Sequence, residues 1–231
     1  MSSAHLKRRD VILACGVTLI VVAASIFGWL AFENYGTDYL AKDRHAAAIN
    51  KLEKQWENGE APMPSSSASG GAYTSLPGDD TSAAEPGQGT PFGLIYVPKF
   101  GKDFVAPIIE ATSLNQLADG VGHGIGTAMP GQIGNVGIAG HRTTWGHPFR
   151  DIDKLVAGDK IEIVLAHDTY TYTVRSHEIV KPDQVDVWAP VPHKPGAKPT
   201  KRMLTLNACH PLYSAAERYI VYAEQTGHTT H

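Results

Sequence analysis

The sequence predicts a mostly β domain, a mostly antiparallel barrel or sandwich, that follows a single N-terminal transmembrane helix. Two observations lead to this prediction: many short runs rich in β-branched and aromatic residues, bounded by glycine and proline, and one long uncharged apolar run near the N-terminus. The 231 residues are 42% hydrophobic and 19% charged, which excludes a wholly disordered chain. The net charge of -3 gives no basic footprint, so we expect no nucleic-acid binding.

The apolar run covers residues 11–32, which are 22 uncharged residues. At about 1.5 Å per residue this run spans the roughly 30 Å hydrocarbon core of a bilayer. A cleavable signal peptide has a shorter apolar stretch, of about 7–15 residues, and usually an A-x-A site, which does not follow here. We therefore expect a retained, single-pass anchor in the cell membrane.

Charges flanking the run predict its orientation. Lys7, Arg8 and Arg9 precede it, and Glu33 and Asp38 follow it. The positive-inside rule then places residues 1–10 in the cytoplasm and everything after the anchor outside the cell.

Composition divides the remainder into three segments. Residues 33–58 have helix-forming composition and are predicted to form a juxtamembrane helix. Residues 59–91 are rich in Gly, Pro, Ser and Ala and cannot bury enough surface to offset the entropy of ordering, so we interpret them as a flexible linker. Residues 92–231 are the predicted folded domain.

Strand patterns dominate this domain. Short helices are expected only around 115–118 and 149–155, and the proline-rich stretch 183–200 is expected to be a long loop, of a kind that is often functional. The predicted strands are 92–97, 105–109, 136–139, 160–165, 169–174, 203–206 and 219–222. Seven or eight short strands at this spacing are typical of a barrel or a sandwich.

The two cysteines of the chain indicate a candidate reactive thiol. Cys15 lies in the anchor and Cys209 lies near the C-terminus, so the two cannot easily meet. An unpaired thiol in an exported domain is either part of an intermolecular disulfide or a free reactive group, and an inert buried cysteine is the alternative. Exported domains tend to avoid unpaired thiols, because an oxidising compartment can oxidise them, so we favour a reactive thiol.

Three residues at strand ends complete a candidate site. Cys209 ends an apolar strand, His141 ends another, and Arg218 opens the last strand. A rigid sheet holds groups at strand ends while they still face solvent. A cysteine supplies a thiolate nucleophile, a histidine moves the proton, and an arginine stabilises negative charge.

The motifs around these residues resemble the sortase family. TLNAC at Thr205–Cys209 resembles the signature T-L-x-T-C, GNVGIAGHRTT around His141 resembles the histidine strand, and ERYIVYAE around Arg218 resembles the arginine segment. The resemblance covers about residues 92–226, and the longer runs GTAMPGQIGN, AGHRTTWGHPFRDIDKL and QVDVWAPVP are most similar to class E sortases of actinobacteria.

This resemblance implies a sortase-like closed β-barrel of seven or eight strands and a membrane-anchored cysteine transpeptidase. Such an enzyme cleaves an LPxTG- or LAxTG-type sorting signal between Thr and Gly. It joins the surface protein to an amine of a peptidoglycan precursor or of a pilin lysine. Cys209 is then the nucleophile, His141 the acid and base, and Arg218 the group that holds the carbonyl or oxyanion. The resemblance implies no cofactor and no metal ligands.

Two positions depart from the family pattern. Ala208 stands where threonine is usual, and Gly124 stands where class E members often carry tyrosine. Both are expected near the substrate groove. The candidate substrate-binding residues are Thr205, Ala208, Asn135 and His123.

Two alternatives stay open from the sequence. An exported Cys–His cell-wall hydrolase of the NlpC/P60 type places Cys before His, whereas His141 comes first here, and the S-x-G-C motif of L,D-transpeptidases is absent. A non-catalytic sortase-like binding domain is the second alternative, because Ala208 departs from the signature.

Overall fold

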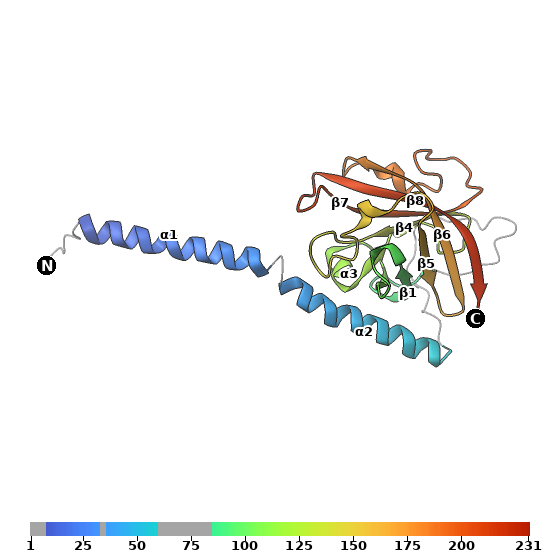
Figure 1. The fold of residues 1–231 in the computed structure, drawn as a ribbon, viewed down its shortest axis with the longest axis horizontal. Coiled ribbons are helices and arrows are strands. Elements are labelled where there is room, and N and C mark those ends of the chain that lie inside the picture. Colours follow the sequence, from blue (N-terminus) through green and yellow to red (C-terminus); the bar gives the residue numbers. More distant parts are fainter. Residues whose placement is uncertain (1–7, 33–35, 60–84) are drawn as a thin grey trace.

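Two helices precede a closed β-barrel (Figure 1). The structure is a computed structural model that describes residues 8–32, 36–59 and 85–231. Helix α1 (Arg8–Ala31) projects away from the barrel, and helix α2 (Thr37–Glu57) runs along one side of it. Within the described residues one helical span, Asp10–Ala31, is long and apolar enough to cross a membrane.

Eight strands close the barrel in the order β1-β2-β3-β4-β7-β8-β6-β5. The predicted barrel is therefore confirmed, with eight strands. Their bounds are β1 Pro91–Tyr96, β2 Val105–Glu110, β3 Val121–His123, β4 Gly134–Ala139, β5 Lys160–Val164, β6 Asp168–Val180, β7 Arg202–His210 and β8 Glu217–Thr230. Short helices interrupt the connections: η2 Pro98–Phe100, α3 Leu114–Asp119, η3 Ile152–Lys154 and η4 Val185–Trp188.

The barrel is mixed rather than wholly antiparallel. Two neighbouring pairs, β2–β3 and β4–β7, run parallel, and the other pairs are antiparallel. Parallel neighbours need crossover connections. The first parallel pair is joined through α3, and the second through the chain from residue 140 to residue 201. The parallel β4–β7 pair carries the candidate site.

Strict alternation along β7 separates the inside of the barrel from the outside. Leu204, Leu206 and Ala208 point into the main hydrophobic core, so Thr205 and Cys209 point outward. A second, smaller apolar cluster lies on that outer face, under the loop between β6 and β7. It consists of Val180, Val187, Ile220 and Tyr222, with Trp188 packed against it.

Helix α2 docks on the barrel domain. It contacts β1, β2 and α3, and it buries Ala41 and Leu52 completely. Its first turn also reaches the loop after β4: the Gly146 N–H donates to Asp38 Oδ1 at 2.9 Å. The predicted juxtamembrane helix therefore packs against the domain.

The start of the ordered domain differs from the sequence expectation. Residues 60–84 of the predicted linker lie outside the described residues. Residues 85–91, also assigned to the linker, are hydrogen bonded to the barrel: the Gly89 N–H donates to the Glu110 carbonyl at 2.8 Å, and the Glu110 N–H donates to the Thr90 carbonyl at 3.0 Å. Backbone pairing with β2 orders this stretch in spite of its small apolar content.

Candidate active site

Strand register brings the three predicted residues to one end of the barrel. Parallel pairing of β4 with β7 places Ala139 beside Asn207, and the Gly140 N–H donates to the Asn207 carbonyl at 3.0 Å. Two residues beyond this pair the chains reach His141 and Cys209. In the antiparallel β7–β8 pair, Cys209 lies directly opposite Arg218. The sequence could place each residue at a strand end, but only the barrel places the ends together.

Cys209 is a free, half-buried thiol on the outer face of β7. Ala208, the residue before it, is expected from the sequence near the substrate groove, but it lies elsewhere. Ala208 is 2% exposed and belongs to the barrel core, facing Tyr219 on β8. Alternation along the strand turns this side chain inward, so the structure does not bring Ala208 to the outer face with Cys209.

His141 is half-buried in the loop that follows β4. Its Nε2 is shielded from solvent and has no hydrogen-bond partner within the described part of the chain. Burial lowers the pKa of His141 below its usual value of 6.5. A buried polar atom without a partner costs free energy, and such atoms are tolerated where a ligand completes the bonding.

Arg218 is the second residue of β8, so it lies at the start of the last strand, as predicted. Its Nη1 donates to the carbonyls of Ala215 at 3.0 Å and Glu217 at 2.9 Å, so the guanidinium is turned toward the β7–β8 loop. The side chain is half-buried, and its Cα stands across from that of Cys209.

Arg142 is a site residue that the sequence analysis missed. It is 4% exposed, and its guanidinium connects the loop after β4, which carries His141, to the end of β7, which carries Cys209. Nη1 donates to His210 Nδ1 at 2.9 Å and reaches the Cys209 carbonyl at 3.5 Å. Nη2 pairs with Asp153 at 2.7 Å. Arginine side chains are normally exposed to solvent, so nothing in the sequence indicated a buried one here. The only available signal for a positioning role was that Arg142 directly follows His141 in the motif AGHR.

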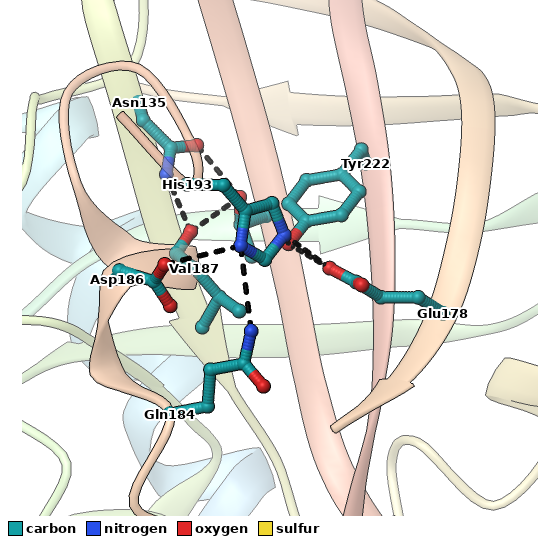
Figure 2. A network of polar contacts seen from close by, with 8 residues as sticks. Asn135, Glu178, Gln184, Asp186, Val187, His193 and Tyr222 are labelled. Atoms are coloured by element: carbon teal, nitrogen blue, oxygen red, sulfur yellow. Dashed lines mark hydrogen bonds and ion pairs between the residues drawn. The ribbon is translucent and has the colours of Figure 1, made fainter. Parts of the chain in front are cut away.

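Asn135 and Thr205 hold the loop that covers the outer face. Thr205 Oγ1 donates to Asn135 Oδ1 at 2.7 Å, and Asn135 Nδ2 donates to the carbonyls of Val187 and Ala189 at 3.1 Å each. Both side chains are fully buried. Figure 2 shows Asn135 bonded to the η4 backbone. Structurally, therefore, these two predicted residues attach η4 to β4 and β7.

Two glycines make room for Trp188 in this loop. A Cβ on Gly137 would lie 1.9 Å from the Trp188 ring, and one on Gly124 would lie 2.7 Å from it. Any side chain at these positions must displace the indole. This packing gives a structural reason for glycine at position 124, where the resembling class often has tyrosine.

A histidine-centred network fixes the far part of the same loop (Figure 2). His193 Nε2 contacts Glu178 Oε1 at 2.5 Å, and its Nδ1 contacts Asp186 Oδ2 at 3.2 Å. The Tyr222 hydroxyl donates to the same Glu178 oxygen at 2.6 Å. Burial by itself lowers the pKa of His193, but the hydrogen bonds and charges of Glu178 and Asp186 outweigh it and raise that pKa.

His123 occupies the interior rather than the outer face. It is fully buried, and its Nδ1 contacts Glu110 Oε2 at 2.8 Å. The sequence pattern predicts this histidine near the substrate. The three-residue strand β3 instead directs it toward β2 and the segment before β1.

A closed barrel that presents a cysteine, a histidine and an arginine at one end has the architecture of a cysteine acyl-transfer enzyme. Comparison with known protein families agrees with this class of enzyme, because residues 95–226 match the model of the Sortase domain. The chain belongs to the sortase family.

The relatives of this chain within the family include class E sortases of Streptomyces. The chain is 33% identical over 219 residues to sortase SrtE1 of Streptomyces coelicolor, a match that covers 91% of this chain and 56% of SrtE1. It therefore spans little more than half the length of that curated relative. A crystal structure of sortase E1 from the same organism, with a tripeptide in the active site, is 36% identical with a TM-score of 0.56 and covers 62% of this chain and 94% of that one. The SrtA sortase of Actinomyces oris is 40% identical with a TM-score of 0.59, over 62% and 84% of the respective chains.

Proposed function

We propose that this chain is a membrane-anchored cysteine transpeptidase that cleaves an LPxTG- or LAxTG-type sorting signal between Thr and Gly. It then joins the new carboxyl end to an amine of a cell-wall precursor or a pilin lysine. The proposal depends mainly on the strand register. The β7–β8 pairing places Cys209 opposite Arg218, and the β4–β7 pairing places it beside the segment that leads from β4 to His141. The related sortase E1 of Streptomyces coelicolor holds a tripeptide in its active site, which supports a peptide as the substrate of this chain.

The proposed reaction has two steps that use the same three side chains. The Cys209 thiolate attacks the threonine carbonyl carbon, an S–C bond forms, and the C–N bond to glycine breaks as His141 gives its proton to the leaving amine. The incoming amine then attacks the thioester and gives a proton back to His141, and the thiolate leaves. Arg218 stabilises the carbonyl oxygen as negative charge develops on it, after turning from the carbonyls of Ala215 and Glu217.

The proposed anchor is α1, with residues 33–231 outside the cell. The last turn of α1 lies close to the candidate active site, because Leu30 and Ala31 line a cavity together with Thr143 and Tyr213. Thr143 lies two residues after His141, and Tyr213 lies four residues after Cys209. The site then opens close to the membrane surface, where a membrane-held sorting signal and a lipid-linked acceptor meet it.

The test uses the full chain in detergent or vesicles. Quenched fluorescent peptides with LPxTG and LAxTG cores are mixed with enzyme and triglycine, and products are identified by mass. We expect cleavage between Thr and Gly and a Thr–triglycine product, both lost in Cys209→Ala. A parallel incubation with purified peptidoglycan tests the hydrolase alternative, which cleavage of a cross-link without transfer to the amine would favour. Binding of the peptide without turnover by the wild-type chain would favour the non-catalytic domain.

A further inference from the structure

Three side chains of metal-ligand type meet in the barrel domain outside the candidate active site. Glu85 lies before β1, Glu110 ends β2, and His123 ends β3. One ligand atom from each lies within 4.8 Å of those of the other two. Glu110 is 1% exposed and His123 is fully buried. The cluster therefore joins three separate elements, with two of its three members buried.

The hydrogen bonds of His123 leave one ring nitrogen directed at the carboxylates. Nε2 lies 3.1 Å from the Ala128 carbonyl and 2.9 Å from Thr127 Oγ1. A carbonyl only accepts, so the bond to Ala128 is made with a hydrogen on Nε2, which leaves Nδ1 as the ring nitrogen that a cation can bind. That Nδ1 faces Glu110 Oε2 at 2.8 Å. A ligating histidine commonly donates its other N–H to a backbone carbonyl in this way.

Glu110 carries an orphaned acceptor in the same place. Its Oε1 is buried and has no hydrogen-bond partner within the described part of the chain. Glu85 and His123 each place a ligand atom within 4.8 Å of a Glu110 carboxylate oxygen. A buried carboxylate oxygen without a partner, next to a second carboxylate and an imidazole nitrogen, forms a donor set that a cation would complete.

Glu85 is itself held in position. The Gly126 N–H donates to Glu85 Oε1 at 2.7 Å. This bond orients the carboxylate of a residue that is only half-buried. It also connects the cluster to the loop between β3 and β4, which contains Thr127.

We infer that Glu85, Glu110 and His123 bind one divalent transition-metal cation, with Zn²⁺ preferred. Two carboxylate oxygens and one imidazole nitrogen suit Zn²⁺, which these groups bind at about 2.0–2.2 Å. The imidazole argues against Ca²⁺ and Mg²⁺, which prefer oxygen ligands alone. Mn²⁺ is a weaker fit to the same donors by the Irving–Williams order.

The metal has a structural role in this position. It cross-links the segment before β1 to the ends of β2 and β3, three elements that are otherwise joined at their edges by backbone pairing. Thr127 connects the site to β4, because its Oγ1 contacts His123 Nε2 and also accepts from the Gly137 N–H at 3.1 Å. Metal binding should therefore stabilise the fold without taking part in transpeptidation.

The experiment uses the full chain in detergent, purified without a polyhistidine tag, treated with a chelator and dialysed. Zn²⁺, Mn²⁺, Ca²⁺ and Mg²⁺ are titrated separately by calorimetry, and Tm is recorded with each. We expect one Zn²⁺ per chain and a Tm rise of about 5–10 °C at a hundredfold excess over Kd. Mn²⁺ should bind more weakly, and Ca²⁺ and Mg²⁺ should leave Tm unchanged. Co²⁺ in place of Zn²⁺ should give a visible d–d absorption band.

Variants locate the site. Glu85→Gln removes a half-buried ligand, so the chain should still fold, with Zn²⁺ affinity reduced at least tenfold and the Co²⁺ band lost. His123→Gln is the second ligand variant. His228→Gln is the control, because it removes an exposed histidine paired with Asp168 and should keep the wild-type Zn²⁺ response. Absence of Zn²⁺ binding in the wild type would overturn the inference. Unchanged binding in both ligand variants would also overturn it.

Discussion

Arg142 Nη1 donates to His210 Nδ1 at 2.9 Å, which joins the residue after His141 to the residue after Cys209. The same nitrogen reaches the Cys209 carbonyl at 3.5 Å, and the guanidinium also bonds the Arg150 carbonyl. The Tyr219 ring packs 5.8 Å from the guanidinium carbon. The relative position of the proposed acid and nucleophile therefore depends on a buried cation that takes no part in the proposed chemistry.

Replacing Arg142 should damage both stability and activity. Arg142→Met leaves His210 and the buried carbonyls without their donor, so we expect a loss of about 3 kcal/mol in the free energy of unfolding. A displaced histidine loop should lower kcat/KM by about 100-fold. Urea denaturation and peptide cleavage measure the two effects. Asp153→Asn is the control, because it breaks only the half-exposed ion pair and should cost less than about 1 kcal/mol. Equal effects of the two variants would contradict the positioning role.

Thiol modification should identify Cys209 as the reactive group. The chain has two cysteines, Cys15 in α1 and Cys209 on the barrel. A charged methanethiosulfonate added to protein in vesicles should label Cys209 and abolish cleavage. Cys209→Ala should lower activity at least about a thousandfold, because the thioester cannot form. Cys15→Ala should remain active and equally sensitive to the reagent. Activity retained in Cys209→Ala would exclude the proposed mechanism.

Ala208→Thr should affect stability more than specificity. The residue is packed in the barrel core, so two additional heavy atoms overpack it at a cost of about 1–3 kcal/mol. The peptide preference should not change, because the side chain faces away from Cys209. Chemical denaturation and a peptide panel measure these effects. Ala157→Thr, at an exposed turn, should stay within about 0.5 kcal/mol of the wild type. A switch of preferred peptide in Ala208→Thr would show that the inward placement is wrong.

The His193 network should make stability depend on pH. The folded-state pKa of His193 is raised by Glu178 and Asp186 against the opposing effect of burial. The stabilisation is therefore fully present below the unfolded pKa of about 6.5 and is lost as pH rises through the folded pKa. His193→Asn tolerates the positive φ of 62° and should lower the free energy of unfolding more at pH 5.5 than at pH 9.

Denaturation at the two pH values measures this difference. His231→Asn, at the exposed C-terminus, should show the same stability as the wild type at both. A larger loss for His193→Asn at pH 9 than at pH 5.5 would contradict the raised pKa.

Asp38 should couple α2 to the loop that carries His141 and His147. Its Oδ1 accepts from the Gly146 N–H, and its Oδ2 lies 3.2 Å from His147 Nδ1. Asp38→Ala should increase hydrogen exchange at the Gly146 amide at least tenfold and cost about 1 kcal/mol. Asp43→Ala, on an exposed part of α2, is the matched control. Unchanged exchange in Asp38→Ala would show that α2 does not hold the loop.

The local pattern of residues was enough to predict most strands. Alternating β-branched runs predicted β5 and the first half of β6, and the apolar run before residue 33 predicted α1. Strand β3 was missed because Val121–His123 is too short to show a period. It exists because β2 and β4 pair with it on either side. The ends of β6 and β8 were also missed, since pairing with each other extends both strands beyond their apolar segments.

The sequence by itself determined that this protein has an apolar helix, a β domain and two candidate reactive residues, His141 and Cys209, each at the end of a strand. These features are local, because side-chain periodicity and strand-end position depend only on near neighbours along the chain. The tertiary structure decided which strands meet, that Ala208 and His123 face inward, and that Arg142 is buried against His210. Those outcomes depend on register and burial, which arise only when strands distant in sequence close into one barrel.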